Sequence, residues 1–149
     1  MKKVLISILA LLLIGSLYFF VFVFEKDKDI SLSHGTISLC KTNLSYGLAD
    51  SDKERKKGLS GRSSLSEKES LLFVFEEKTI PSFWMKDMNF PIDIIWIDES
   101  KKIVDITEDF DPSTYPETVS PISPVLYVLE TRASFAKENH CIVGSSVEF

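Results

Sequence analysis

The longest apolar stretch of the chain lies at its beginning. Residues Val4 to Phe24 contain no charge over 21 positions, follow two lysines and precede the mixed-charge segment EKDKD. About 20 apolar residues suffice to span a membrane, whereas the apolar part of a cleaved signal peptide is usually ~7–15 residues long and ends at small residues. Because this run ends in YFFVFVF, we expect an uncleaved anchor over residues 1–24, with a cleaved signal peptide as the alternative. The lysines before the run predict a cytoplasmic N-terminus and a domain outside the cytoplasm.

Beyond a polar tether over residues 25–35, which we expect to be mobile, apolar residues alternate with polar ones or form short runs, and both patterns predict strands. These strand segments are TISLCK (36–41), SLLFVFEE (70–77), VLYVLET (125–131) and CIVGSSVEF (141–149). A hairpin is predicted where the DESKK turn separates residues 92–97 from residues 103–106.

Two short helices are predicted between the strands. Asp50 or Ser51 can cap a helix that runs to Lys57, with acidic residues near its start, lysines near its end and Gly58 as its stop. The segment RASFAKENH, residues 132–140, predicts the second helix.

Four of the six prolines fall within residues 111–124, which predicts a loop, since proline lacks a backbone donor and fixes φ. Strands otherwise dominate and are joined by short turns. We therefore expect a mainly β (α+β) domain over residues 36–149: a small closed or nearly closed mixed β barrel with two short helices, preceded by one transmembrane helix.

Charge limits the classes of partner. Beyond the expected anchor the chain has 15 basic and 22 acidic residues, a formal net charge of −7. This argues against nucleic acid or anionic lipid, because basic patches bind both. His34 and His140 show no paired-ligand spacing with the cysteines, and no phosphate-binding glycine loop or serine elbow is present. We therefore expect no metal, cofactor or nucleic acid.

The chain has two cysteines, Cys40 and Cys141, which are 101 positions apart. An even count in an oxidising compartment favours a disulfide that ties the first strand to the last. Two separate buried thiols are the alternative, since free cysteine behaves as a small hydrophobic residue.

Several segments in order, ERKKGLSGRSSL, LLFVFE, FWMKDMNFPIDIIWIDESKKIVDI, PVLYVLE and FAKENHCIVGSSVEF, resemble the family called domain of unknown function 192. The resemblance covers residues 36–149 and implies a compact, barrel-like β domain with short helices, but no activity. The chain departs from the family pattern where Asp87 stands in place of a commoner Asn, Ser60 in place of Met, and Ser70 and Ser134 in place of glycines.

Two carboxylates lie on otherwise apolar strand faces. Alternation puts Asp93 on the face of Ile95 and Ile97, and Glu130 on the face of Leu126 and Val128. Buried charges are costly unless they are paired and hydrogen-bonded, so each carboxylate should have a partner or lie at the mouth of a cleft. The candidate partners are Arg55, Arg62 and Lys86, and arginine fits a carboxylate best.

Three hypotheses account for these residues. They form a structural ion-pair network; or they line a ligand cleft with an aromatic floor; or Asp93 and Glu130 act as the carboxylate pair of a hydrolase. The cleft would consist of Arg62, Trp84, Lys86, Asn89, Asp93 and Glu130, with Trp84 as the surface aromatic. We expect non-catalytic binding of a small polar or carbohydrate-like ligand, or of an envelope component, with the hydrolase and a purely structural envelope protein as alternatives.

Overall fold

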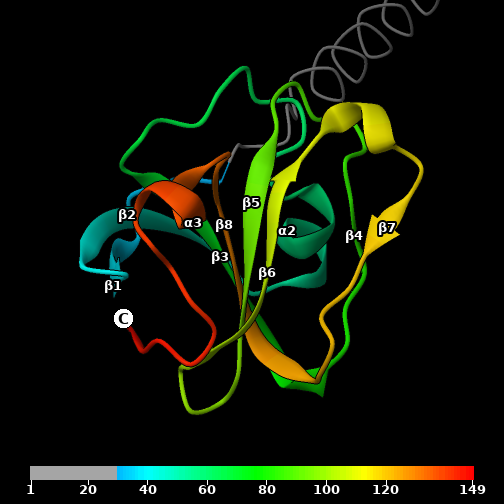
Figure 1. Ribbon diagram of the computed structural model, residues 1–149. Helices are drawn as coiled ribbons and strands as arrows, with labels where there is room; N and C mark the ends of the chain where they lie inside the picture. Colours follow the sequence, from blue (N-terminus) through cyan, green and yellow to red (C-terminus); the bar gives the residue numbers. More distant parts are fainter. Residues whose placement is uncertain (1–29) are drawn as a thin grey trace, which may run out of the picture.

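A computed structural model describes residues 30–149, and Figure 1 shows a curled sheet with short helices on both of its sides. The elements in chain order are β1 (Gly35–Leu39), β2 (Thr42–Ala49), α2 (Asp52–Lys57), β3 (Glu69–Thr79), β4 (Phe83–Trp84), β5 (Ile92–Ile97), β6 (Ile103–Phe110), the 3-10 turn η1 (Pro112–Thr114), β7 (Thr118–Val119), β8 (Val125–Arg132), α3 (Phe135–Glu138) and β9 (Val147–Glu148).

The main sheet has seven strands in the order β6-β5-β8-β3-β2-β1-β9, and β4 pairs with β7 in a separate ribbon. Only β2 and β3 run parallel among these pairs. The sheet curls into a half-barrel and not a fully closed barrel. Its two edges meet at one end, where Val147 donates to the carbonyl of Lys101 and Ile103 donates to that of Ser145.

The two faces of the sheet build separate cores. One contains Phe73, Ile94 and Trp96 and lies on the side of α2 and the β4–β7 ribbon. The other contains Ile95, Leu129 and Phe135 and lies on the side of α3 and the C-terminal segment. All six residues of β5 are buried, because neighbouring residues of this central strand supply opposite cores.

The first helix agrees closely with the sequence prediction. Ser51 is its N-cap, and Ser51 and Glu54 form a reciprocal capping box. Gly58 ends the helix at φ 50° and ψ −136°, a conformation that favours glycine. The hairpin of β5 and β6 is also confirmed, although β6 continues to Phe110.

The β2 strand was not predicted, because its apolar positions are interrupted by small and polar residues. Gly47 lies in its middle, where an added Cβ would approach the carbonyl oxygen of Ser31 to 2.5 Å. Only a residue without a side chain fits this close approach of two backbone segments. The sequence of β2 therefore shows little hydrophobic alternation, although the position of Gly47 tolerates no larger residue.

The described part of the expected tether is packed against the domain. Leu32 is buried in the first core, and the amide of His34 donates to the carbonyl of Tyr46. The anchor over residues 1–24 lies outside the described residues. Among residues 30–149 every helix is too short and too polar to cross a membrane.

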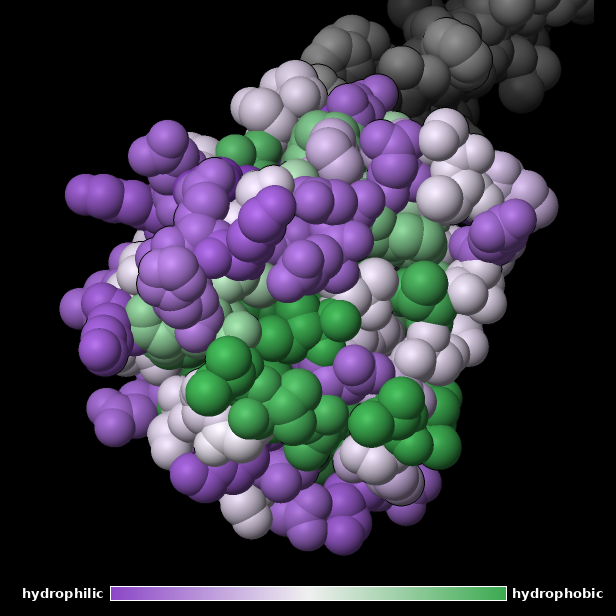
Figure 2. Space-filling view, viewed as in Figure 1, coloured by the Kyte–Doolittle hydropathy of each residue, from purple (hydrophilic) through white to green (hydrophobic). Residues whose placement is uncertain are grey.

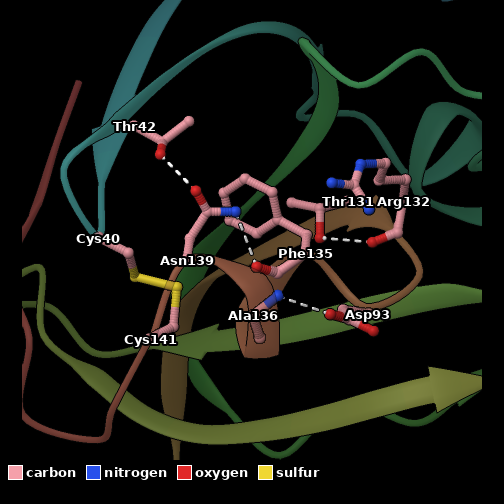
Figure 3. The surroundings of a disulfide bond; sticks show 9 residues. All are labelled: Cys40, Thr42, Asp93, Thr131, Arg132, Phe135, Ala136, Asn139 and Cys141. Atoms are coloured by element: carbon pink, nitrogen blue, oxygen red, sulfur yellow. Dashed lines mark hydrogen bonds between the residues drawn. A yellow bond between two sulfur atoms is a disulfide. The ribbon is translucent and has the colours of Figure 1, made fainter.

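Cys40 and Cys141 form a disulfide with a Cα–Cα distance of 5.2 Å. Figure 3 shows that it joins the turn between β1 and β2 to the chain just after α3. Cys40 and Lys41 have φ of 50° and 64°, as a two-residue hairpin turn between right-twisted strands requires.

Hydrophobic side chains also gather on the surface. Figure 2 shows hydrophilic residues over the upper part of one face and a hydrophobic area over the lower part. The exposed large hydrophobic residues include Ile142 and Val143 in the segment after α3 and Ile122 in the loop before β8.

Candidate functional site

Asp93 is fully buried and its carboxylate accepts hydrogen bonds from three backbone amides. Oδ1 accepts from Asp109 N at 2.8 Å and from Ser134 N at 3.1 Å, and Oδ2 accepts from Ala136 N at 2.8 Å. Figure 3 shows the carboxylate beside Ala136, in the first turn of α3. Ser134 is the N-cap of this helix but makes no side-chain cap bond, so Asp93 caps the helix from the neighbouring strand.

The expectation that Asp93 pairs with a cationic side chain is therefore wrong. Arg55 donates to the carbonyl of Val74 and bonds Asp52, and Arg62 donates to the carbonyl of Ile30. Backbone amides satisfy the Asp93 carboxylate because charged acceptors form strong hydrogen bonds with them.

Glu130 lies on the opposite face of the sheet. Ile94 pairs with Glu130 and Asp93 pairs with Thr131 across β5 and β8, and directly opposed residues of an antiparallel pair share a face. Asp93 therefore belongs to the side of α3 and Glu130 to the side of α2. The expected cleft that contains both carboxylates does not form, and they cannot act on one substrate as a pair.

One oxygen of the Glu130 carboxyl is buried without a hydrogen-bond partner among residues 30–149. The residue is 6% exposed, and its Oε2 atom is buried and has no hydrogen bond within residues 30–149. Burial raises the pKa of the Glu130 carboxyl from 4.5 to about 8, since a low dielectric disfavours the charged form. At neutral pH this group is mainly a protonated acid that can donate a hydrogen bond.

Glu130 lines a pocket of about 220 Å³ that we call the Glu130 pocket. Its apolar wall comes from β3, from β4 and from the segments around β4. Its polar rim comes from α2 and the loop that follows. The lining consists of Arg55, Lys56, Lys57, Gly58, Leu59, Ser60, Phe73, Phe75, Pro81, Ser82, Phe83, Trp84, Met88 and Glu130.

The aromatic wall is held by contacts with the core. The rings of Phe73 and Phe83 meet edge to face with centroids 4.9 Å apart, and Phe83 meets Trp96 at 5.4 Å. Trp84 is the exception, because it is 47% exposed and contacts the ring of Tyr115 at 6.2 Å. Packing against the core therefore fixes the inner part of the wall, and the indole of Trp84 at its edge is accessible to a ligand.

Gly58 completes the pocket beside the carboxyl. An added Cβ at this position would lie 3.5 Å from the Phe73 ring and 3.9 Å from Glu130 Oε2. The same glycine that ends α2 therefore leaves the space next to the carboxyl open. The sequence predicted only its role as a helix stop.

Hydrogen bonds join the loop after α2 to the loop after β4. Ser60 Oγ donates to the carbonyl of Lys86 at 2.8 Å, and Gly61 N donates to that of Asp87 at 2.8 Å. Asn89 Nδ2 donates to the carbonyl of Arg62 at 2.7 Å. Asp87 has φ of 57°, a conformation that Asn and Asp tolerate better than most residues. Arg62 and Asn89 thus position the loops next to the pocket and do not line it.

A wider surface hollow of about 810 Å³ adjoins the Glu130 pocket, and we call it the lysine hollow. It shares Lys56, Lys57, Ser60 and Trp84 with that pocket. Its full lining is Ile30, Ser51, Lys53, Glu54, Lys56, Lys57, Ser60, Gly61, Trp84, Lys86 and Asp87. Within residues 30–149 no cluster of His, Cys, Asp and Glu side chains could hold a metal ion.

The structure thus separates the six predicted cleft residues. It brings Glu130 and Trp84 to one pocket and Lys86 to the adjoining hollow, and it removes Asp93 to the other face. The inner side of the aromatic wall, Phe73 and Phe83, also packs against the core residue Trp96. No sequence signal distinguishes a core phenylalanine from one that also lines a pocket.

These features define a class: a mainly β half-barrel domain with an unpartnered buried carboxyl in an aromatic pocket. The chain belongs to the family of domain of unknown function 192 (DUF192, "Uncharacterized ACR"), whose model matches residues 36–149. No curated protein matches the chain.

Two solved structures share the fold. One is a protein of unknown function from Novosphingobium aromaticivorans, with 22% identity and a TM-score of 0.74 over 83% of this chain and 95% of its own. The other is a candidate transcription regulator from Sinorhizobium meliloti, with 26% identity and a TM-score of 0.73 over 79% of this chain and 96% of its own. The shared unit makes up almost all of each neighbour's chain.

Proposed function

We propose that the domain is a non-catalytic binding module for a small, carbohydrate-like ligand that occupies the Glu130 pocket. The observation that supports this most strongly is the buried Glu130 carboxyl, whose Oε2 atom has no partner within the described chain. An unsatisfied buried polar group costs about 1–3 kcal/mol. A ligand that accepts a hydrogen bond from this acid would recover that free energy.

The rest of the pocket fits the same ligand class. The ring faces of Phe83 and Trp84 offer apolar area for the flat face of a sugar ring. The volume of about 220 Å³ lies below the roughly 300–1,000 Å³ of pockets for drug-sized ligands. A single ring with hydroxyl or carbonyl groups is therefore the largest body that we expect inside.

The pocket lining favours binding over hydrolysis. Glycoside hydrolysis generally uses two carboxyl groups on either side of the scissile bond. Glu130 is the only carboxyl group among the lining residues of the Glu130 pocket. An envelope polymer that presents such a ring at its end is the larger partner consistent with this proposal.

The proposal is tested by NMR titration of the ¹³C-labelled chain with neutral monosaccharides and their methyl glycosides. We expect saturable shifts of the Glu130 carboxyl carbon and of Phe83, with constant affinity below pH 8. Affinity should fall above pH 8, where the carboxyl loses the proton that it donates.

Two matched variants sharpen this test. Glu130→Gln keeps a donor, so it should bind within a few-fold of wild type and lose the pH dependence. Glu130→Leu has no donor and should not bind. If affinity instead rises with pH, or if Glu130→Leu binds normally, the proposed hydrogen bond is refuted.

We also propose that the domain lies outside the cytoplasm and is anchored by residues 4–24. The uncharged run and the disulfide between Cys40 and Cys141 support this, since disulfides persist mainly in oxidising compartments. Protease added to cells that have lost their outer barrier but keep an intact cytoplasmic membrane should degrade the domain, whereas a cytoplasmic control protein should survive. We do not propose for this chain the transcription-regulator role printed for one neighbour, because a net charge of −7 disfavours binding to nucleic acid.

A further inference from the structure

The lysine hollow concentrates positive charge in an otherwise acidic domain. Four lysines line it, Lys53, Lys56, Lys57 and Lys86, together with two carboxylates, Glu54 and Asp87. The lining therefore carries a formal charge of +2, whereas the chain beyond residue 24 carries −7. The Glu54 carboxylate is already bonded to Ser51 in the capping box.

Helix stability does not explain this arrangement. Lys53 precedes Lys56 and Lys57 by three and four positions, so the three side chains share one face of α2, a spacing at which like charges do not stabilise a helix. Lys56 and Lys57 in the last turn suit the helix dipole, but Lys53 lies in the first turn, where a cation is disfavoured.

The fourth lysine comes from a different segment and is positioned by the loop contacts. Ser60 Oγ bonds the carbonyl of Lys86, and Gly61 N bonds that of Asp87. These bonds hold the loop after β4 against the end of α2. The convergence of two segments therefore depends on specific contacts, not on one helix alone.

We propose that the lysine hollow binds a phosphate group carried by the ligand whose uncharged ring occupies the Glu130 pocket. This rests on the proposed function, since it gives that ligand a second group. The two sites share Lys56, Lys57, Ser60 and Trp84, so one molecule can fill both. The ligand class is then a phosphorylated sugar or a sugar phosphate at the end of a polymer.

Phosphate fits the cations better than a carboxylate does. All four cations of the hollow are lysines; a phosphate group carries nearly two charges and three acceptor oxygens, so it can engage several ammonium groups at once, whereas a carboxylate has one charge and two oxygens. Arg55 lines the inner pocket and bonds backbone carbonyls and Asp52. The net charge of −7 disfavours an extended polyanion such as nucleic acid, whereas the local charge of the hollow suits a single phosphate group.

The phosphate could belong to a free sugar or to a lipid headgroup. Ile30, at which the described chain begins, lines the hollow. If residues 4–24 form the proposed anchor, the six steps from Phe24 to Ile30 span at most ~20 Å. The experiment must therefore distinguish these two sources.

The test compares inorganic phosphate, glucose and glucose 1-phosphate by NMR and calorimetry on the full chain, held in an uncharged detergent. We expect glucose 1-phosphate to bind about tenfold more tightly than glucose, a ratio that one charge-assisted hydrogen bond can supply. Added salt should reduce this ratio. Inorganic phosphate alone should shift the amides of residues 53–61 and 84–87.

The variant Lys56→Gln/Lys57→Gln/Lys86→Gln should abolish the tenfold preference, and Lys86→Gln alone should lower it and leave glucose binding unchanged, because Lys86 lines the hollow but not the Glu130 pocket. The variant Lys41→Gln/Lys68→Gln/Lys137→Gln removes the same charge outside the hollow and should keep the preference. Equal affinity for both sugars, or an equal loss in both variants, overturns the phosphate subsite. If inorganic phosphate binds but glucose and glucose 1-phosphate do not, the subsite stands and the sugar pocket fails.

Vesicles identify the source of the phosphate. Binding to phosphatidylglycerol vesicles but not to phosphatidylcholine vesicles, with loss in the hollow variant, assigns it to a lipid headgroup. Binding to glucose 1-phosphate without vesicle binding assigns it to a soluble or polymer-borne sugar.

Discussion

Asp93 and Glu130 are both buried acids on adjacent strands of one sheet, yet their surroundings differ completely. Asp93 accepts three backbone hydrogen bonds and caps α3. Glu130 faces an aromatic pocket, and its buried Oε2 atom has no hydrogen bond in the described part of the chain. Charge and burial are therefore poor guides to function by themselves. What distinguishes a structural acid from a candidate binding acid is whether the fold supplies its partners.

The difference follows from what covers each face. The side of Asp93 is covered by a turn into α3 and by Asp109 at the end of β6, whose amides point at the carboxylate. The side of Glu130 is covered by aromatic rings and by a glycine that lacks a side chain. The first environment supplies three backbone donors to the acid, whereas the second raises the pKa of Glu130 by burial and stabilises the neutral acid.

Removing the Asp93 carboxylate should have the largest effect on stability. In Asp93→Ala the amides of Asp109, Ser134 and Ala136 lose their acceptor, and each unpaired buried donor costs about 1–3 kcal/mol. We expect the free energy of unfolding to fall by roughly 5 kcal/mol in urea denaturation, with early loss of α3. Glu108→Ala, at an exposed position of the same strand as Asp109, serves as the control. A loss below about 1 kcal/mol would show that water replaces the carboxylate.

Glu130 should make stability depend on pH in the opposite direction to an ordinary salt-bridged acid. Its pKa is about 8 in the folded chain and 4.5 when unperturbed, so the folded state holds the proton more tightly between these values. The stability from this proton is fully present below pH 4.5 and is lost as the pH rises through 8. We expect a loss of about 3–4 kcal/mol between pH 5 and pH 8.

Glu130→Gln isolates this contribution, because it removes one titrating group and keeps nearly the same shape. The difference in unfolding free energy between wild type and variant should vary with pH as described, while contributions from all other acids cancel. A difference that stays constant from pH 5 to pH 8 would mean that Glu130 finds a partner or water in solution.

Gly58→Ala should affect both the fold and the pocket. Its φ of 50° and ψ of −136° lie where a side chain costs roughly 1–3 kcal/mol, and the new methyl group would stand beside Glu130 Oε2. Gly144→Ala is the matched control, because Gly144 has φ of 93° and open space around it. Both variants should lose stability in urea denaturation, but only Gly58→Ala should weaken ligand binding. Equal binding by both would place the ligand elsewhere.

The sequence predicted the local elements that depend on neighbouring residues. The capped helix at Ser51 and the β5–β6 hairpin carry their signals within a few positions, and alternation assigned Asp93 and Glu130 to the correct faces of their own strands. It could not relate the two faces to each other, because that requires the strand order. The half-barrel, the β2 strand and the β4–β7 ribbon likewise depend on packing between distant segments.

The partners of the two acids were beyond sequence reasoning for a further reason. Any residue can donate a backbone amide, so the three donors around Asp93 leave no trace in residue types. Glu130 Oε2 has no hydrogen-bond partner among residues 30–149. The sequence could not predict this, because its lysines and arginines all offer themselves as candidate partners. Arg55 was a reasonable candidate partner, but its guanidinium donates hydrogen bonds to the carbonyl of Val74 and to the carboxylate of Asp52.

Trp84→Ala should change stability least and still weaken binding, so it tests the pocket side of the comparison without disturbing the fold. Trp84 is 47% exposed and its ring contact is with Tyr115, itself 46% exposed. The free energy of unfolding should therefore change by less than about 1 kcal/mol, well below the 3–5 kcal/mol typical of a buried aromatic. Sugar titration should show weaker binding, since the indole provides the outer apolar wall. Tyr115→Ala removes the contact but no residue of the Glu130 pocket, so it should bind normally; if it loses binding as Trp84→Ala does, the orientation of the indole is what matters.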